Sequence, residues 1–407
     1  MYGVRLLRQR SVQVAALATL ALVVLAFRGL QFAGLTHEIQ FGYDFSAYWL
    51  AGLSLVSGLS PYTAEQLAGP FSPQQAGLYL YPPPLAGGMA PLVRVFPQGF
   101  DAAVWIWTGL GAAILAAAVL ALWRSERLGE RFPILSGRGR WFLVAGAFAF
   151  PPVVGELVLG NVHLLLLGLL TLAWLGVRRS DLRGQEIAGL AVGAAAIVKV
   201  FPGLLIVWFL LTRRSTAAGG VVVGLAALTL ITLPLTGIEP WLRYPTVLAN
   251  IGPPVDLRDT LAPTVWIATE VGFTVARILV TVIGLAIVEL GARRAIKAGD
   301  RDAVGTDGTS PETARSFAIA VTVSVLIAPA LYHHYLAVLV LPLILGLSAG
   351  VSLRWLAAAY LLMWGGEQGA LGDASWVVNR LLPTLGALLL LSALIASRAR
   401  VPAVARR

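Results

Sequence analysis

Long apolar stretches recur from one end of the chain to the other, and they constrain its fold more than any other feature. Of the 407 residues, 58% are hydrophobic and only 12% are charged, whereas a soluble domain carries about 25% charged residues. Such a chain lacks the polar surface to cover a globule in water, and apolar runs of about 20 residues match the thickness of a bilayer. Because continuous runs favour helices over the alternating pattern of a barrel, the sequence predicts an all-α polytopic membrane protein.

We expect a single transmembrane domain over residues 1–407 with about 11–12 helices that span the bilayer. The first apolar run follows three arginines, and no cleavage site of small residues follows the run, which indicates a retained signal anchor. The candidate spans are residues 12–35, 101–123, 141–158, 161–177, 186–212, 217–236, 271–292, 315–332, 334–351, 354–366 and 381–397.

The distribution of arginine predicts which segments face the cytoplasm, since positively charged loops stay on that side. It favours a protein of the cytoplasmic (inner or plasma) membrane whose N- and C-termini are both cytoplasmic. The arginine-rich segments are the N-terminus, 124–140, 178–183, 213–214, 293–315 and the C-terminal tail, and the outer segments are 37–100, 237–270 and 367–380. The net charge of +10 is divided among these short clusters, so we expect no nucleic-acid partner.

This topology requires the stretch 186–212 to enter the membrane and return to the same side, because arginines flank both of its ends. A break at Lys199-Val200-Phe201-Pro202 would permit such a hairpin, since proline disfavours helix continuation and restricts the residue before it. One long tilted helix is the alternative, and it would place the arginine-rich 293–315 loop outside.

Two polar segments stand apart from the apolar runs. The 37–100 loop is long, holds aromatic and proline clusters, and is expected to be a compact folded loop at the membrane surface, where a long loop is usually functional. Residues 299–314 are polar and predict a flexible cytoplasmic linker. The sequence holds no cysteine, HExxH motif, P-loop, dinucleotide fingerprint or GxSxG motif, so we expect no metal, no nucleotide cofactor and no serine hydrolase.

A small set of polar side chains falls at the outer ends of the predicted spans, where ionisable groups indicate function by default. Each member also has a simpler interpretation: a helix N-cap for the aspartate, a turn residue for the asparagine, and side chains that reach interfacial water for the lysine and histidines. Their convergence on one side of the membrane favours chemistry. The set is Asp44, Asn161, His163, Lys199, His333 and His334. Glu156 and Arg28 lie within apolar runs, and we expect them to form an ion pair in the bundle.

Ordered motifs around these residues resemble glycosyltransferase family 87, a family of membrane-embedded GT-C-type enzymes. The first-loop motifs are GYDFSAYWLAG at 42–52, GLSPY at 58–62 and YPPPLA at 81–86. GNVHLLLLGLL at 160–170, KVFPGLLIVWFLLTRR at 199–214 and APALYHHYLAVLVLPL at 328–343 follow in the family's order. Asn161 stands where the family usually has glutamine and His163 where it usually has asparagine.

The resemblance implies a GT-C bundle that takes a polyprenyl-phosphate sugar, and no nucleotide sugar, as co-substrate on the extracytoplasmic face. The actinobacterial α-1,2-mannosyltransferases of glycolipid synthesis belong to the family, so mannose is the expected sugar and a glycolipid or glycan the acceptor. By the same resemblance Asp44 is the catalytic base, and Lys199 with His333 or His334 lies near the donor phosphate.

The residues permit an inverting transfer in which a carboxylate takes the proton of an acceptor hydroxyl while the lipid phosphate leaves. Tyr48 and Tyr81, with Tyr43 and Trp49, would offer faces and hydroxyls to sugar rings. An arabinofuranosyltransferase with a polyprenyl-phosphate arabinose donor is an alternative. A lipid or glycolipid transporter is an alternative from another class, but it would show inverted repeats and polar groups near the bilayer midplane.

Overall fold

The structure is a computed structural model that describes residues 2–38, 41–73, 75, 77–179, 181–252, 260–302, 310–365 and 377–397. It is 81% helical, and the described residues form no β-strand. Within the described ranges, five helices are long and apolar enough to cross a membrane, so the predicted class of all-α polytopic membrane protein is confirmed. These spans are Val14–Leu35 of α1 (Tyr2–Leu35), α5 (Phe100–Ser125), α12 (Ser215–Thr236), Phe273–Gly299 of α15 (Phe273–Asp302), and Val378–Ala396 ending in α19 (Leu382–Ala396).

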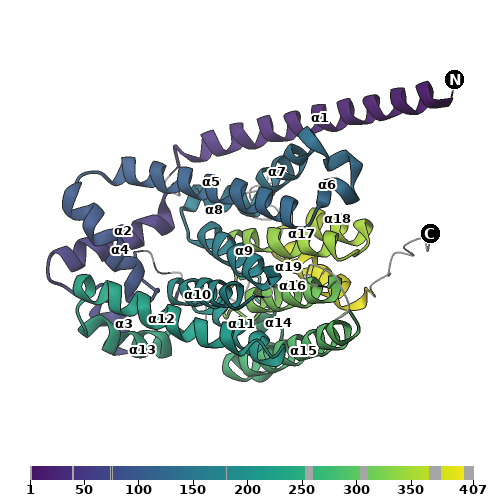
Figure 1. The fold of residues 1–407 in the computed structure, drawn as a ribbon. Coiled ribbons are helices and arrows are strands. Elements are labelled where there is room, and N and C mark those ends of the chain that lie inside the picture. The colour runs from purple at the N-terminus through teal and green to yellow at the C-terminus, as the bar shows by residue number, and fades with distance from the viewer. Residues whose placement is uncertain are drawn as a thin grey trace.

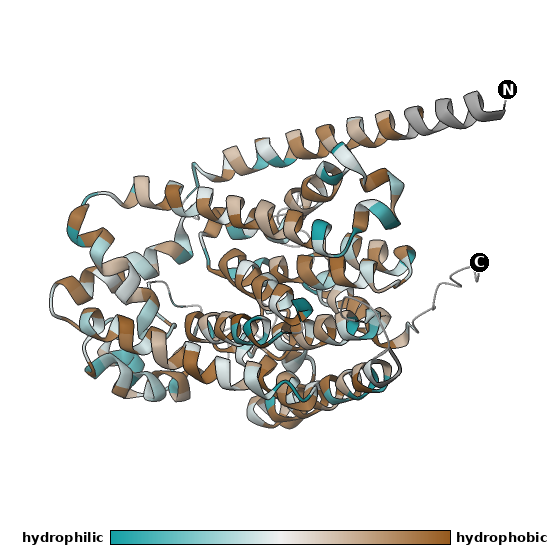
Figure 2. Ribbon diagram, viewed as in Figure 1, coloured by the Kyte–Doolittle hydropathy of each residue, from teal (hydrophilic) through white to brown (hydrophobic). Residues whose placement is uncertain are grey.

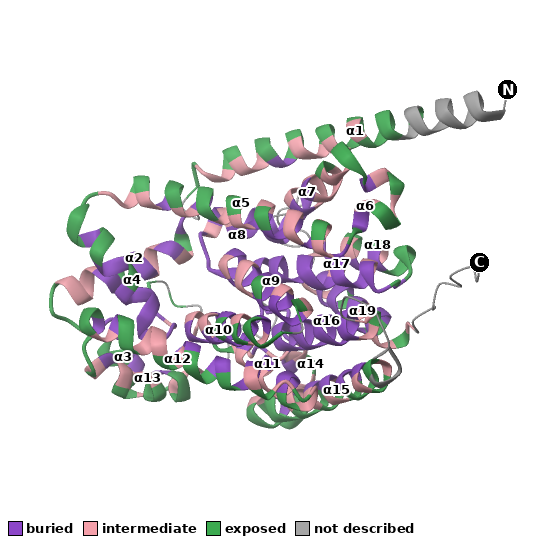
Figure 3. Ribbon diagram, in the orientation of Figure 1, coloured by how far each residue is buried: buried purple, intermediate pink, exposed green. Residues whose placement is uncertain are grey.

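The long helices expose apolar flanks instead of burying them (Figures 2 and 3). Only 6% of the α1 span and 17% of the α15 span are buried within the protein. Contiguous apolar surface of this extent is unfavourable in water, so lipid must cover it.

The number of long helices is smaller than the 11–12 spans predicted, because several apolar runs fold as shorter or broken helices. The run over 141–158 bends by 63° between the segments Gly137–Ala149 and Pro151–Leu159, and counting this pair as one span raises the total to six. Proline lacks the amide hydrogen that continues a helix, so two successive prolines at 151 and 152 explain the bend. The remaining short helices are α7 (Arg140–Ala149), α8 (Pro151–Leu159), α9 (His163–Arg179), α10 (Leu182–Val198), α14 (Pro263–Val271), α16 (Pro311–Leu326), α17 (Val340–Ser348) and α18 (Leu353–Leu362).

The chain turns back on itself after α10, as the hairpin interpretation of 186–212 predicts. A Cβ added at Gly189 would collide with the carbonyl oxygen of Ala217, and one added at Gly193 would lie 2.5 Å from that of Val221. A step of four residues along α10 thus matches a step of four residues along α12 in the same direction, so the two helices run parallel. Their backbones approach closely because glycines lie at the contact. The 3₁₀ turn Phe201–Leu204 and α11 (Leu205–Leu211) carry the chain back between them.

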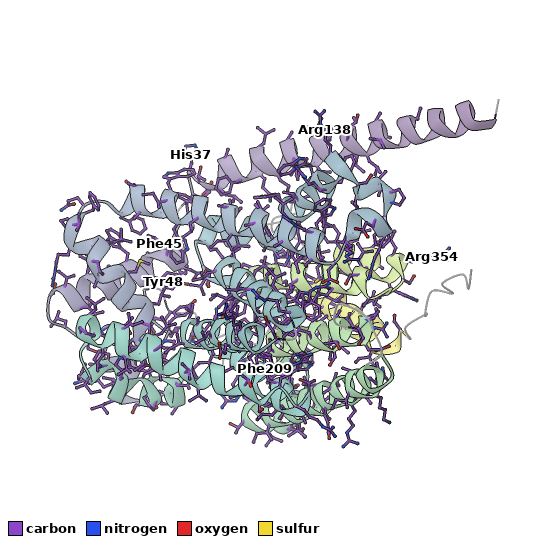
Figure 4. The ribbon with its side chains drawn as sticks, viewed as in Figure 1. His37, Phe45, Tyr48, Arg138, Phe209 and Arg354 are labelled. Atoms are coloured by element: carbon purple, nitrogen blue, oxygen red, sulfur yellow. The ribbon has the colours of Figure 1, made fainter. Side chains whose placement is uncertain are left out.

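One end of the bundle is built from the first loop and from the segment that follows α12. The first loop folds into α2 (Tyr43–Val56), α3 (Ala64–Ala68) and α4 (Pro83–Val95), which gather with α13 (Glu239–Asn250) at the left of Figure 1. The two segments are joined directly, since the Phe71 amide donates to Asn250 O at 3.0 Å. Arg138 and Arg354 lie towards the opposite end (Figure 4).

The expected linker over 299–314 lies partly outside the described residues. Its first part belongs to α15, which continues to Asp302, and its last part opens α16 at Pro311. Both edges of this segment are therefore helical, and the prediction of a flexible cytoplasmic linker stays a prediction. Residues 303–309 between them are not described.

Candidate active site

Asp44 is placed by a glycine turn immediately before α2. Gly42 has φ 72°, and a Cβ there would lie 2.7 Å from Cγ2 of Val104, so the turn requires glycine. The Gly42 amide donates to Val158 O at 2.8 Å, which joins the start of α2 to the end of α8. Gly42 itself occupies the N-cap position, and no side chain caps the helix. The N-cap interpretation of Asp44 is therefore wrong, because its carboxylate points to the bundle instead.

Asn161 is the hub of the site. Its Nδ2 donates to Asp44 Oδ2 at 2.8 Å and lies 3.3 Å from His334 Nε2. Its Oδ1 accepts from the Val162 amide at 2.7 Å and from the Tyr81 hydroxyl at 3.3 Å. These two donors fix the orientation of the amide, so that its nitrogen must face the carboxylate.

Lys199 and His334 complete the polar centre. Lys199 is the residue at which α10 ends, with extended backbone dihedrals, and its Nζ lies 3.7 Å from the ring centroid of Tyr335. His334 Nε2 lies 3.6 Å from Asp44 Oδ2. A cation over an aromatic face is stabilised by the ring quadrupole. Tyr335 therefore supports the lysine, although the sequence reasoning did not single it out.

A cavity of about 660 Å³ opens over this centre. Among the described lining residues the carboxylate is that of Asp44 and the basic side chains are those of Lys199, Arg277 and Arg380, so the cavity suits an anionic ligand. Three predicted site residues that line it, Asn161, Lys199 and His334, converge on Asp44, and the lining continues along an apolar wall. The polar lining residues are Tyr43, Asp44, Gln75, Tyr81, Asn161, Lys199, Tyr244, Arg277, Thr281, Tyr332, His333, His334, Tyr335 and Arg380, and the apolar wall includes Leu80, Phe201, Leu248, Ile251 and Ile327.

Two predicted site residues lie behind the cavity wall. Tyr48 is fully buried and donates its hydroxyl proton to the Tyr81 hydroxyl at 3.0 Å. His163 is also fully buried, with its Nε2 3.1 Å from Lys199 Nζ. His333 does line the cavity, but its Nε2 lies 3.0 Å from Met363 O and so faces a backbone carbonyl. Of the two adjacent histidines, His334 is the one that approaches Asp44.

Burial and polar contacts shift the pKa of Asp44 in opposite directions. Burial raises its pKa above the ordinary aspartate value, while the Asn161 hydrogen bond and the charge of Lys199 lower the pKa, and burial is the largest of the three. A carboxylate with a raised pKa is a stronger base once it is ionised.

The predicted ion pair between Glu156 and Arg28 is wrong. Arg28 Nε donates to Ala149 O at 3.2 Å and its Nη1 to Gln31 Oε1 at 2.6 Å. Glu156 Oε2 lies instead 2.9 Å from His163 Nδ1. Glu156 and His163 are seven residues apart, and the chain turns at Gly160 between them. Helical periodicity does not reveal such a contact.

Glu156, His163 and His334 also bring three possible metal-ligand atoms within 4.8 Å of one another. A carboxylate with two imidazoles is a donor set that suits zinc. The Lys199 ammonium, however, lies 3.1 Å from His163 Nε2 and would repel a divalent cation there. Lys199 thus contacts the nitrogen of His163 that a metal ion would need. The expectation that the protein uses no metal stays a prediction.

The fold and the site together define a multi-pass membrane protein with a carboxylate-bearing cavity at one end of its bundle. A protein-family model, that of glycosyltransferase family 87, matches residues 79–307, which is more than half of the chain. The chain belongs to this family and is a membrane glycosyltransferase. The match contains Tyr81, Asn161, His163 and Lys199, whereas Asp44 lies before it. Comparison with curated proteins and with solved structures gave no match.

Proposed function

We propose that this glycosyltransferase moves a sugar, with mannose as the first candidate, from a polyprenyl-phosphate donor to a lipid-linked or glycan acceptor. The reaction inverts the anomeric centre and takes place on the extracytoplasmic face. The observation that carries the proposal is that Asp44 and Lys199 line the same cavity, because the transfer needs a base for the acceptor and a cation for the leaving phosphate.

Asp44 has the geometry of a general base. Its side chain is 24% exposed, and its described partners, Asn161 Nδ2 and His334 Nε2, both approach Oδ2. Oδ1 therefore has no bond to a described residue, and Asp44 lines the cavity. An acceptor hydroxyl would give its proton to Oδ1 as its oxygen bonds to the anomeric carbon. The bond from that carbon to the phosphate oxygen breaks, and polyprenyl phosphate leaves with the electron pair.

The other charged groups of the cavity suit the leaving group. Lys199 would stabilise the negative charge that develops on the phosphate, and a hydrogen bond from His334 would add to it. Arg277 and Arg380 place two more cations in the lining, and Phe201, Leu248 and Ile327 supply apolar surface for the lipid chain. A lipid-linked donor explains why such a site sits in a bundle covered by lipid.

The described lining residues hold one carboxylate, which favours transfer over hydrolysis. Glycosidases use two carboxyl groups separated by about 5–10 Å on either side of the bond that breaks. Asp44 is the one carboxylate among the described lining residues, since Glu156 lies behind the wall and is bonded to His163. A phosphate leaves readily without a general acid, so one base is sufficient.

The positions of the arginines support the proposed side of the membrane. Arg138 and Arg354 lie towards the end of the bundle opposite α2 and α4 (Figure 4). The hairpin after α10 also brings Arg213 and Arg214 back towards the level at which α10 begins, where Arg179 ends the preceding helix. With basic residues kept inside, the cavity opens on the outer face of the cytoplasmic membrane.

The test uses purified protein in detergent or proteoliposomes with labelled polyprenyl-phosphate mannose and polyprenyl-phosphate arabinose. We expect the label to pass from polyprenyl-phosphate mannose to a glycolipid acceptor, with the anomeric configuration inverted in the product. Transfer from the arabinose donor alone would replace mannose with arabinose in the proposal. Movement of labelled lipid between leaflets without any new glycosidic bond would overturn the proposal in favour of a transporter.

A further inference from the structure

Glu156 makes a set of contacts that the proposed reaction does not use. The residue is 1% exposed, and its Oε1 accepts hydrogen bonds from the backbone amides of His163 and Leu164. Its Oε2 lies 2.9 Å from His163 Nδ1. The carboxylate therefore faces three donors, which compensates the cost of burying it.

These contacts determine the tautomer of His163. An ionised carboxylate accepts hydrogen bonds and donates none, so with Glu156 ionised the proton of the neutral imidazole is on Nδ1. Nε2 then carries a lone pair, and it accepts a hydrogen bond from Lys199 Nζ at 3.1 Å. A doubly protonated ring would turn an N–H toward the ammonium, so like charges disfavour it.

We infer that Glu156 is a positioning residue that acts through His163 to aim the Lys199 ammonium into the cavity. The inference rests on the proposed role of Lys199 at the leaving phosphate. His163 holds the ammonium from one side and the Tyr335 ring holds it from another, 3.7 Å away. Neither Glu156 nor His163 lines the cavity, so both act on the donor through the lysine.

The substitution Glu156→Gln tests the relay because it keeps the shape and removes one acceptor. If the amide oxygen of Gln stays on the backbone amides, its NH₂ group faces His163 Nδ1 and donates to it. The imidazole proton must then move to Nε2, where it opposes the ammonium of Lys199. The isosteric change is therefore expected to reverse the tautomer.

Nitrogen-15 NMR of histidine-labelled protein reads the tautomer directly and needs no sugar transfer. The chain has four histidines, so His163 is assigned from the signal that disappears in a His163→Phe variant. We expect the Nδ1–H form in the wild type and the Nε2–H form in Glu156→Gln. An Nε2–H or doubly protonated His163 in the wild type would overturn the relay, whatever the activity of the enzyme.

Activity gives the second readout. We expect kcat of Glu156→Gln to fall roughly tenfold to a hundredfold with a small change in KM, because a misaimed charge loses transition-state stabilisation. The matched control is Glu126→Gln, which also removes a buried charge but keeps both donors, Trp174 and Arg178, on one oxygen. The kcat of Glu126→Gln should stay within about twofold of the wild-type value, because Glu126 contacts no residue of the relay and distant sites act independently.

Two outcomes would contradict the relay while leaving the proposed function intact. One is a full wild-type kcat in Glu156→Gln with a reversed tautomer. The other is loss of transfer on chelation with recovery on added Zn²⁺, which would assign Glu156, His163 and His334 to a metal instead. Conversely, an enzyme that transfers no sugar from any polyprenyl-phosphate donor would end the proposed function, and the NMR result would still decide on the tautomer.

Discussion

Replacing Asn161 with leucine tests whether one amide keeps Asp44 in its reactive state. Leucine has nearly the same shape as asparagine but makes no hydrogen bond. The change removes the 2.8 Å bond to Asp44 Oδ2 and the 3.3 Å bond from the Tyr81 hydroxyl. The carboxylate keeps its burial and loses the neutral donor that opposes the effect of burial on its pKa.

The expected size follows from the hydrogen bond to the charged group. Such a bond contributes about 1.5–3 kcal/mol, and about 1.4 kcal/mol corresponds to one pKa unit. The pKa of Asp44, already raised by burial, should therefore rise further by about 1–2 units in the variant. The base works only when ionised, so activity is lost as the pH falls through this pKa, and the variant should lose it at a higher pH.

The assay is kcat/KM for sugar transfer between about pH 4.5 and 8.5. The wild-type acid limb should have its midpoint above the ordinary aspartate value of about 4. In Asn161→Leu the midpoint should move upward by about 1–2 units, so that kcat/KM falls about tenfold to a hundredfold relative to wild type at pH values below both midpoints. A thermal unfolding midpoint close to that of the wild type shows that the fold is intact. An acid limb that stays in place in a folded variant would refute the reasoning.

Three further changes test the packing, the cation and the sidedness. Gly189→Ala should lower the unfolding temperature by several degrees, because its Cβ meets the α12 backbone and overpacking costs about 1–3 kcal/mol; Gly219→Ala, with open space around it, should not lower it. Lys199→Met should reduce kcat about a hundredfold or more, whereas the same change at the exposed Lys297 should leave kcat unaltered. A cysteine in place of the exposed Glu65 in this cysteine-free chain should react with an impermeant thiol reagent in intact cells; labelling only after permeabilisation would contradict the assigned face.

The class of fold was predictable because the bilayer imposes it on composition. Apolar runs of bilayer length have to become helices, and the described structure consists of helices. The hairpin after α10 was also predictable, since Pro202 follows Lys199 in an apolar run bounded by arginines. The number of long spans was not, because the apolar pattern continues through the bend at Pro151 and because the close approach of α10 to α12 depends on tertiary packing.

The site was predictable to the extent that its residues are polar in an apolar sequence. The structure brings Asp44, Asn161, Lys199 and His334 together from four separate segments. It could not be known from the sequence which of the two adjacent histidines would face the carboxylate. That choice is made by the 3₁₀ turn His333–Leu339, which follows an extended residue and sets the direction of each ring.

The supporting residues were harder to find because their contacts cross elements. Glu156 and His163 meet over a glycine turn, and Tyr335 reaches Lys199 from a different part of the chain. Tyr48 was predicted to bind sugar, yet it lies under Tyr81 and reaches the cavity only through that hydroxyl. A sequence motif identifies a polar residue near the site. Tertiary packing decides whether that side chain lines the cavity or lies behind its wall.

The most direct test of the central claim is the turnover of Asp44→Asn beside wild type with the donor that supports transfer. Asparagine keeps the size of the side chain and takes no proton, so kcat should fall by about 10²–10⁴-fold, the usual contribution of a general base. Glu65→Gln is the matched control, since it neutralises an exposed carboxylate of the same loop outside the cavity, and it should keep full activity. A folded Asp44→Asn enzyme that turns over at the wild-type rate would contradict the account.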